Sequence, residues 1–290
     1  MDWKKLALCG AMTVGSFSLV ACGGGDDPGT MMAVTRTYVV STISIPEATT
    51  DGRAAGFNLD GMVTDGSGTD CVGASPDYIS TNDMEPGTDN GLATLVPTLA
   101  MLLGGGSLDE TIQEQITDGS LILLMEVSDI NSYNNDTSVS VQLFLGEVPG
   151  GGAPMTAGAG LAPGQTFTST MALGSPVTGA IESGRLRVTT PLLMLSIATT
   201  DFTVGLPIRS AQVRADITET GLTNGAIGGG LDVEDLAVAA EMIMAGLGDT
   251  VRSVLGGVAD LNPQAADPMV CDTLSVGILF SGVEATRNPG

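Results

Sequence analysis

Two acidic stretches hold the residues of this sequence that are best suited to chemistry. Asp60 and Asp65 lie in one Gly-containing segment, and Asp89 and Asn90 follow further along the chain. Carboxylate and amide oxygens on flexible loops are the ligands that Ca²⁺ takes, about six to eight at a time. Their spacing is not that of an EF-hand loop. We expect a structural Ca²⁺ site formed by these four residues, with a solvated acidic loop as the alternative.

The composition excludes most other catalytic chemistry. The sequence has no His, its only lysines are Lys4 and Lys5, and its only Trp is Trp3. Residues 6–290 therefore lack an imidazole to activate a nucleophile and an amine to form a Schiff base or bind phosphate. Carboxylates are the only abundant acid–base groups, and a glycosidase needs just two of them. We expect no enzyme, with a carboxylate-only hydrolase as a less favoured alternative.

The charge balance excludes one class of partner. The 290 residues include 33 Asp and Glu but only 10 Lys and Arg, which gives a formal net charge of −23. Binding to nucleic-acid phosphates or to anionic lipid headgroups requires clustered Lys and Arg. We therefore expect no nucleic-acid partner and no membrane attachment through a basic patch.

The first residues follow the plan of an export signal. Lys4 and Lys5 make a short positive region, residues 6–20 are mainly apolar, and Leu19-Val20-Ala21-Cys22 precedes a Gly-rich acidic segment. The apolar stretch is too short, and too often interrupted by Gly and Ser, for a membrane-spanning helix. The four residues that end at Cys22 resemble the lipobox of bacterial lipoproteins.

This resemblance implies cleavage before Cys22, a diacylglycerol on its thiol and an acyl chain on its new amino group. Several chains give stable membrane anchoring where one is marginal. Gly23, in place of the Asp that retains lipoproteins in the inner membrane, favours the outer membrane, with the domain in the periplasm or at the cell surface. An ordinary secretory signal is the alternative, with Cys22 buried or in a disulfide.

The remaining cysteines predict a disulfide. If Cys9 leaves with the signal peptide and Cys22 carries lipid, only Cys71 and Cys271 remain. Two thiols in an oxidising envelope favour one disulfide between them. Two separate buried thiols are the alternative.

The pattern of apolar residues predicts an α+β fold. We expect an antiparallel β-meander sheet, either a sandwich or a partly closed barrel, with two helix pairs packed against it. The expected helices span residues 92–103, 107–118, 232–245 and 249–260. The expected strands span residues 35–45, 121–127, 139–145, 177–182, 185–189, 192–198, 202–208, 211–217, 222–228 and 274–280, and we expect the glycines 228–230 to break the chain of strands.

The chain divides into three parts on this basis. Residues 1–21 form the lipoprotein signal peptide, 22–33 a flexible tether, and 34–290 the α+β domain, which would consist of two lobes if the Gly/Pro-rich segment 148–165 is a linker. Beyond the lipobox, the segments 56–60, 87–90 and 227–230 make the chain resemble uncharacterised envelope lipoproteins of the myxobacterial type. This resemblance implies a location and no activity.

We expect a non-catalytic, lipid-anchored protein of the cell envelope with a structural or partner-binding role. The strands and helices present small aliphatic faces with few aromatic residues. If the sheet curls around a cavity, an amphiphile or lipid lies inside it, and the protein is a carrier. Ordinary core filling is the alternative explanation of those faces.

The anchor gives the first testable prediction. Cys22→Ser removes the thiol that receives the lipid, so we expect the variant to leave the washed membrane fraction and to appear as soluble protein. Fractionation followed by immunoblotting measures this. Retention of the variant in washed membranes contradicts the lipid anchor.

Overall fold

Long runs of alternating apolar and polar residues form the strands of a large antiparallel sheet. The computed structural model describes residues 33–64, 77–102, 107–198, 203–243, 246–263, 267 and 270–290, and residues 33–290 belong to one unit. The elements run in the order β1 (Val34–Ser44), β2 (Arg53–Ala54), β3 (Tyr78–Ser80), β4 (Pro86–Thr88), α1 (Leu92–Leu102), α2 (Leu108–Asp118), β5 (Ile122–Ile130), β6 (Asn135–Glu147), β7 (Thr156–Ala157), β8 (Gly160–Leu161), β9 (Gln165–Ala172), β10 (Val177–Glu182), β11 (Arg185–Ala198), β12 (Thr203–Ile217), β13 (Gly221–Asp232), α3 (Val233–Ile243), α4 (Leu247–Leu255), β14 (Leu261–Pro263) and β15 (Cys271–Pro289).

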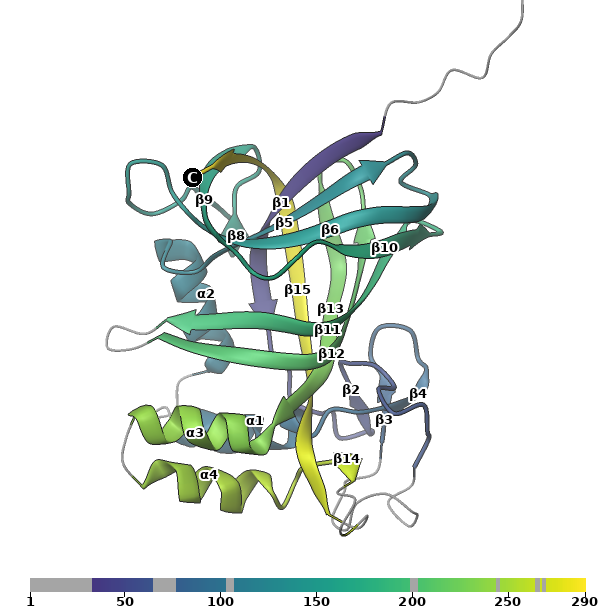
Figure 1. The fold of residues 1–290 in the computed structure, drawn as a ribbon, viewed down its shortest axis with the longest axis vertical. Coiled ribbons are helices and arrows are strands. Elements are labelled where there is room, and N and C mark those ends of the chain that lie inside the picture. Colours follow the sequence, from purple (N-terminus) through teal and green to yellow (C-terminus); the bar gives the residue numbers. More distant parts are fainter. Residues whose placement is uncertain are drawn as a thin grey trace, which may run out of the picture. The chain divides into compact units, whose positions relative to one another are not determined.

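Eight of these strands pair in a cycle. The order is β1–β5–β6–β10–β11–β12–β13–β15, and β15 pairs again with β1. The four strands from β10 to β13 are consecutive in the chain and form the predicted meander. The predicted α+β class is confirmed, and of the two expected sheet arrangements the structure has the partly closed barrel (Figure 1).

The last strand, β15, connects most of the sheet. Its first part pairs with β13 and β14, its middle also pairs with β1, and its end pairs in parallel with β9. Figure 1 shows β15 running through the unit from the helices to the opposite end. The core therefore depends on residues from both ends of the described chain.

Strand β5 is apolar on both faces, as expected for a strand in the centre of a sheet. Leu123 and Met125 point into the ring, whereas Ile122 and Leu124 lie beneath β9. Gly146 has no Cβ, and this leaves room for Ile122 and Leu124 next to the carbonyl oxygen of Thr168. Each face of β5 is thus covered by a different part of the sheet.

The glycines at 228–230 do not break β13, and the expectation that they would was wrong. The strand continues to Asp232 because these residues pair with β15. A Cβ at Gly228 would overlap the ring of Phe57, and one at Gly277 on β15 would overlap the carbonyl oxygen of Ala55. These glycines let the 55–57 segment lie directly on the sheet.

The predicted breaks within β11 and β12 are also absent, because each pair of short expected strands is one continuous strand. β11 continues through Pro191 and β12 through Pro207. Within β12, Ser210 has a positive φ of 49° and lies at a register shift in the pairing with β13, where the strand continues without a break. The two strands make a long hairpin (Figure 1).

The four described helices lie in the chain as two consecutive pairs, as expected. α3 and α4 lie side by side and α3 packs against β12, β13 and β15, while α1 packs against β15 and α2 against β1 (Figure 1). Within the described part of the chain, no helix has the length and apolar character needed to cross a membrane.

Cys271 opens β15, is buried, and is disulfide-bonded. Its predicted partner, Cys71, lies outside the described residues. The pairing of these two cysteines therefore stays a prediction.

Candidate functional site

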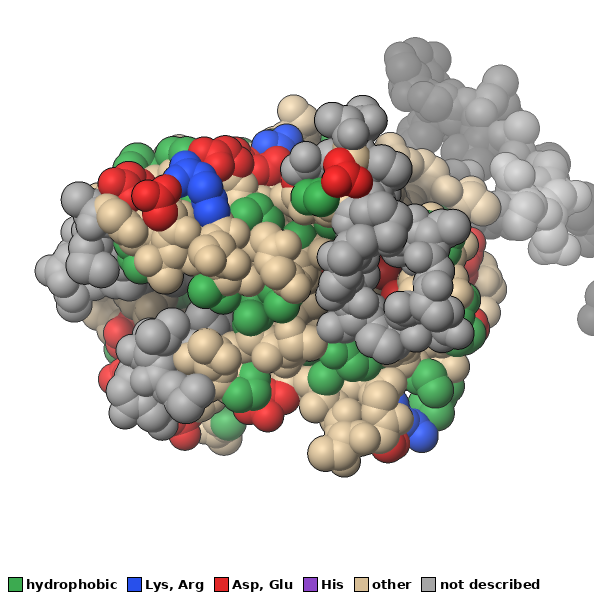
Figure 2. Space-filling model, turned by 90° about the horizontal axis from the view of Figure 1, so that it is seen from below, with side chains coloured by type: hydrophobic (Ala, Val, Ile, Leu, Met, Phe, Trp, Pro, Cys, Tyr) green, Lys and Arg blue, Asp and Glu red, His purple; other side chains and the backbone are tan. Residues whose placement is uncertain are grey.

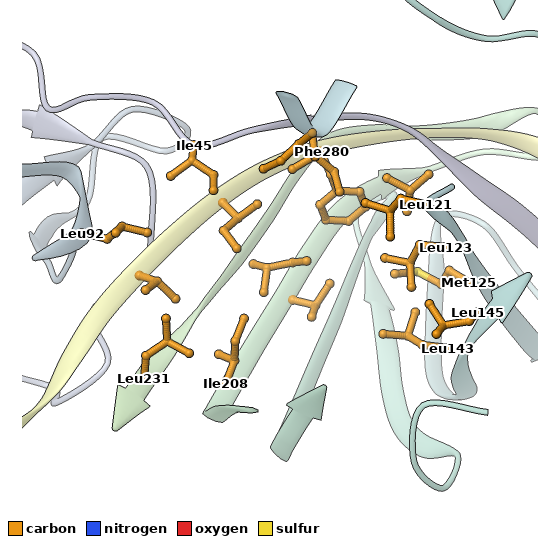
Figure 3. Close-up of a pocket in the computed structure, with 17 residues that line it drawn as sticks. Ile45, Leu92, Leu121, Leu123, Met125, Leu143, Leu145, Ile208, Leu231 and Phe280 are labelled. Carbon is orange, nitrogen blue, oxygen red and sulfur yellow. The ribbon is translucent and has the colours of Figure 1, made fainter. Parts of the chain in front are cut away.

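The interior of the ring contains an apolar cavity of about 90 Å³. All seventeen residues that line it are aliphatic, Met or Phe. Figure 3 shows Leu123, Met125 and Leu143 on one side of the cavity and Ile45 and Leu231 on the other. A cavity with such a lining offers no hydrogen bond to water, so it suits an apolar occupant.

The alternation of the strands places these side chains. Successive residues of a strand point to opposite faces, so every second residue of a ring strand points inward. On β15, Val276, Ile278 and Phe280 line the cavity, while Gly277 lies under the 55–57 segment on the other face. The same period brings Leu143 and Leu145 of β6 to the cavity.

A second apolar hollow, of about 260 Å³, adjoins the cavity. We call it the mouth. It shares Met125, Leu143 and Val213 with the cavity. Its other lining residues come from β6, from the connection between β9 and β10, from the start of β10 and from β11: Val141, Leu173, Gly174, Ser175, Val177, Val188, Thr190, Pro191, Leu192, Leu193 and Met194.

A third hollow, of about 350 Å³, is polar. Its lining includes hydroxyl and amide side chains and Arg185, whose Nε donates to Asp216 at 2.8 Å. Asp216 also accepts from Nδ2 of Asn224 at 2.8 Å, so one carboxylate positions two lining residues. This polar cleft shares only Phe280 with the cavity.

Two carboxyl groups have little contact with solvent: Asp89, which is buried before α1, and Asp260, which is half-buried between α4 and β14. Asp89 is 4% exposed, and its Oδ2 accepts from the backbone N–H of Leu59 at 2.6 Å. Burial raises the pKa of Asp89 to about 7, and the charges of Asp60, Asp77 and Asp260 also raise it. Burial likewise raises the pKa of Asp260. Neither residue lines the cavity, the mouth or the polar cleft.

Asp260 fixes the start of α1 against β15. Its carboxylate accepts from the backbone N–H of Ser275 at 2.8 Å and from the Ser275 hydroxyl. The Ser275 oxygen in turn accepts from the backbone N–H of Gly91 at 2.6 Å. These bonds use the Asp260 carboxylate to hold backbone groups, which is a structural task.

The predicted calcium ligands are also engaged in local hydrogen bonds. Asn90 caps α1, since its Oδ1 accepts from the backbone N–H of Ala93 at 3.1 Å while its Nδ2 donates to the carbonyl oxygen of Ala55 at 2.7 Å. Asp60 Oδ1 accepts from the backbone N–H of Met62 at 2.7 Å. Asp65 lies outside the described residues. Among those described, no group of three or more Asp, Glu, Cys or His side chains is placed to hold a metal ion.

Sequence reasoning missed one buried charged group, Arg214 of β12. It pairs with Asp83, lies 4.5 Å above the ring of Phe57, and donates to Ser80 Oγ at 3.2 Å. Burial lowers the pKa of Arg214, and Asp83 opposes that shift. An alternating strand does not reveal which polar residue is covered by a distant loop, so the sequence held no signal for this contact.

The comparisons with known proteins add no relative to this picture. A scan against protein-family models, a search of curated proteins and a search of solved structures each find no match. The class of site is therefore defined by geometry alone, as an apolar cavity in a partly closed barrel with an apolar mouth.

Asp89 predicts how stability depends on pH. Its pKa is about 7 in the folded protein, above the ordinary value of 3.8 for an aspartate, so the folded state binds the proton more tightly. The stabilising contribution of the protonated group is full below pH 4 and is lost as the pH rises to about 7. We expect Asp89→Asn to remove this loss, which amounts to at most about 4 kcal/mol.

Denaturant unfolding at pH 4.5 and pH 8 measures this effect. Asp89→Asn should gain stability relative to the parent at pH 8 and little at pH 4.5, while Asn keeps an acceptor for the Leu59 N–H. The exposed Asp118→Asn is the control. Parallel pH profiles for the parent and Asp89→Asn would show that Asp89 is not the responsible group.

Proposed function

We propose that this protein is a non-catalytic, lipid-anchored protein of the cell envelope whose barrel binds the apolar part of a small amphiphile. The observation that carries the binding role is the cavity, with its seventeen apolar lining residues and its adjoining mouth. Ligand pockets are commonly about 300–1,000 Å³ and mostly apolar. Together the two hollows reach the lower end of that range.

Two further observations support this role over the alternatives. Met125, Leu143 and Val213 line both the cavity and the mouth, which places a second apolar hollow directly beside the first. The carboxyl groups of Asp89 and Asp260, whose pKa values are raised, accept hydrogen bonds from backbone N–H groups and line none of the three hollows, which speaks against a carboxylate-only hydrolase.

The location belongs to the same proposal. The lipobox ending at Cys22 and the likeness to envelope lipoproteins of the myxobacterial type support attachment to the outer membrane. A lipid anchor would keep the barrel beside a source of amphiphiles.

A neutral fluorescent probe tests the binding role. We expect the full chain carrying Cys22→Ser to bind N-phenyl-1-naphthylamine saturably. Val213 lies where the cavity and the mouth meet, so Val213→Phe should fill that junction and weaken binding at least tenfold, or ~1.4 kcal/mol.

The matched control is Val238→Phe on α3, at a valine that is 48% exposed and lines neither hollow. Overpacking costs about 1–3 kcal/mol, so circular dichroism must show that Val213→Phe remains folded. Equal binding by the two folded variants, or no saturable binding by the parent, would contradict the proposal.

A structural Ca²⁺ at the acidic loops remains part of the proposal. The carboxylates of Asp60, Asp77 and Asp260 all repel the charge of Asp89, and a divalent cation would relieve that repulsion. We expect a higher melting temperature in millimolar Ca²⁺ than in chelator or in Mg²⁺ at equal ionic strength. Equal melting temperatures in Ca²⁺ and Mg²⁺ would contradict a Ca²⁺ site and would support a solvated acidic loop.

A further inference from the structure

The wall of the ring splits at the mouth. Along one edge of β6, residues 135–141 pair with β10 and residues 144–147 pair with β9. β9 then continues to the end of β15, whereas β10 continues to β11. Because the two strands lead to different neighbours, the sheet divides where β9 ends and β10 begins.

One side of this split is an edge of β11. β10 pairs with β11 only at residues 185–188, and beyond them β11 pairs with β12 alone among the described strands. The other side is the connection at residues 173–177, which β6 holds through two bonds. The Leu173 N–H donates to the carbonyl oxygen of Leu143 at 2.9 Å, and Gln142 Nε2 donates to that of Gly174 at 3.1 Å.

Apolar side chains lie between the mouth at the split and the cavity. Met125, Leu143 and Val213 face both hollows, and Leu192, which is 47% exposed, lies at the outer side of the mouth. The polar cleft meets the cavity only at Phe280, which is 5% exposed. The mouth therefore borders the cavity along three shared residues, whereas the polar cleft borders it at one.

The polar groups at the mouth carry no charge. Its lining contains no Asp, Glu, Lys or Arg among the described residues, and its side-chain polar groups are the hydroxyls of Ser175 and Thr190. The chain as a whole has a net charge of −23, and the face in Figure 2 shows more acidic than basic side chains. An anionic headgroup at the mouth would find repulsion and no cation to pair with.

We infer that the mouth between β6 and β11 admits an uncharged amphiphile, which enters tail first and leaves a hydroxyl-bearing headgroup beside Ser175 and Thr190. This inference rests on the proposed function, because it requires the cavity to accept the tail. It adds the route of entry and the class of headgroup, and it excludes free fatty acids as the preferred ligand.

The test compares 1-dodecanol with laurate, which have the same chain length, as competitors of the fluorescent probe at pH 8 and low salt. The full chain with Cys22→Ser should bind dodecanol at least tenfold more tightly than laurate. High salt should narrow the difference by screening the repulsion of the anion. For shorter alcohols, affinity should fall about fourfold for each methylene removed.

A charge placed at the mouth should change this selectivity. Ser175 is exposed, and Ser175→Arg puts a cation at the rim, so laurate should bind about tenfold more tightly while dodecanol changes less than twofold. Ser253→Arg adds the same charge at an exposed position of α4 outside the mouth and should match the parent. Circular dichroism confirms that both variants are folded.

Three outcomes would overturn the inference. If laurate binds the parent as tightly as dodecanol, the headgroup class is wrong. If Ser175→Arg and Ser253→Arg change laurate binding equally, the ligand does not enter through the mouth. The polar cleft beside Phe280 would then be the other route. If the parent binds the probe but neither competitor displaces it, the cavity takes no amphiphile of this kind. Failure of the parent to bind the probe at all would instead overturn the proposed function.

Discussion

The pairing of β1 with β15 is the contact on which the rest of the structure depends. These are the first and last strands of the described chain, and residues 37–44 of β1 pair with residues 279–285 of β15. Without this pairing the eight strands would form an open sheet with one apolar face in water. With it, that face becomes an interior, and Val40, Ile43, Val276 and Ile278 line a cavity.

The closure is incomplete for a reason that the strand order makes clear. One edge of β6 pairs with both β9 and β10, and these two strands leave toward opposite parts of the sheet. Backbone hydrogen bonds therefore join neighbouring strands around the ring except beyond residue 188 of β11. There β11 pairs with β12 alone among the described strands. The apolar mouth lies there, with the exposed Leu192 at its outer side, and an exposed apolar surface of a protein commonly serves in binding.

Most elements of this fold could be predicted from sequence, because the period of apolar residues is local. The helices at 92–102 and 108–118 and the alternating residues of β12 are examples. The strands β2–β4 could not, because two or three residues are too few to show a period, and the parallel pairing of β9 with β15 could not, because the two strands lie far apart in the chain. The glycines at 228–230 do not break the strand for the same reason, since distant groups lie against them: Phe57 against Gly228, Arg209 against Gly229 and Thr273 against Gly230.

The candidate site shows the same division. Alternation revealed that the strands have small aliphatic faces, but it does not show whether such faces fill the interior or leave a cavity. Asp60, Asp89 and Asn90 were chosen for their chemistry, and the structure shows each accepting a backbone hydrogen bond. The cavity depends on ring size and side-chain packing, which are properties of the assembled sheet.

Diffraction from crystals of the protein under xenon pressure would test the central claim most directly. Xenon enters apolar cavities that exclude water. The account predicts xenon density inside the ring between Met125, Ile227 and Val276, with no ordered water at that position before pressurisation. An interior that takes up no xenon, or one that holds ordered water, would contradict an apolar binding cavity.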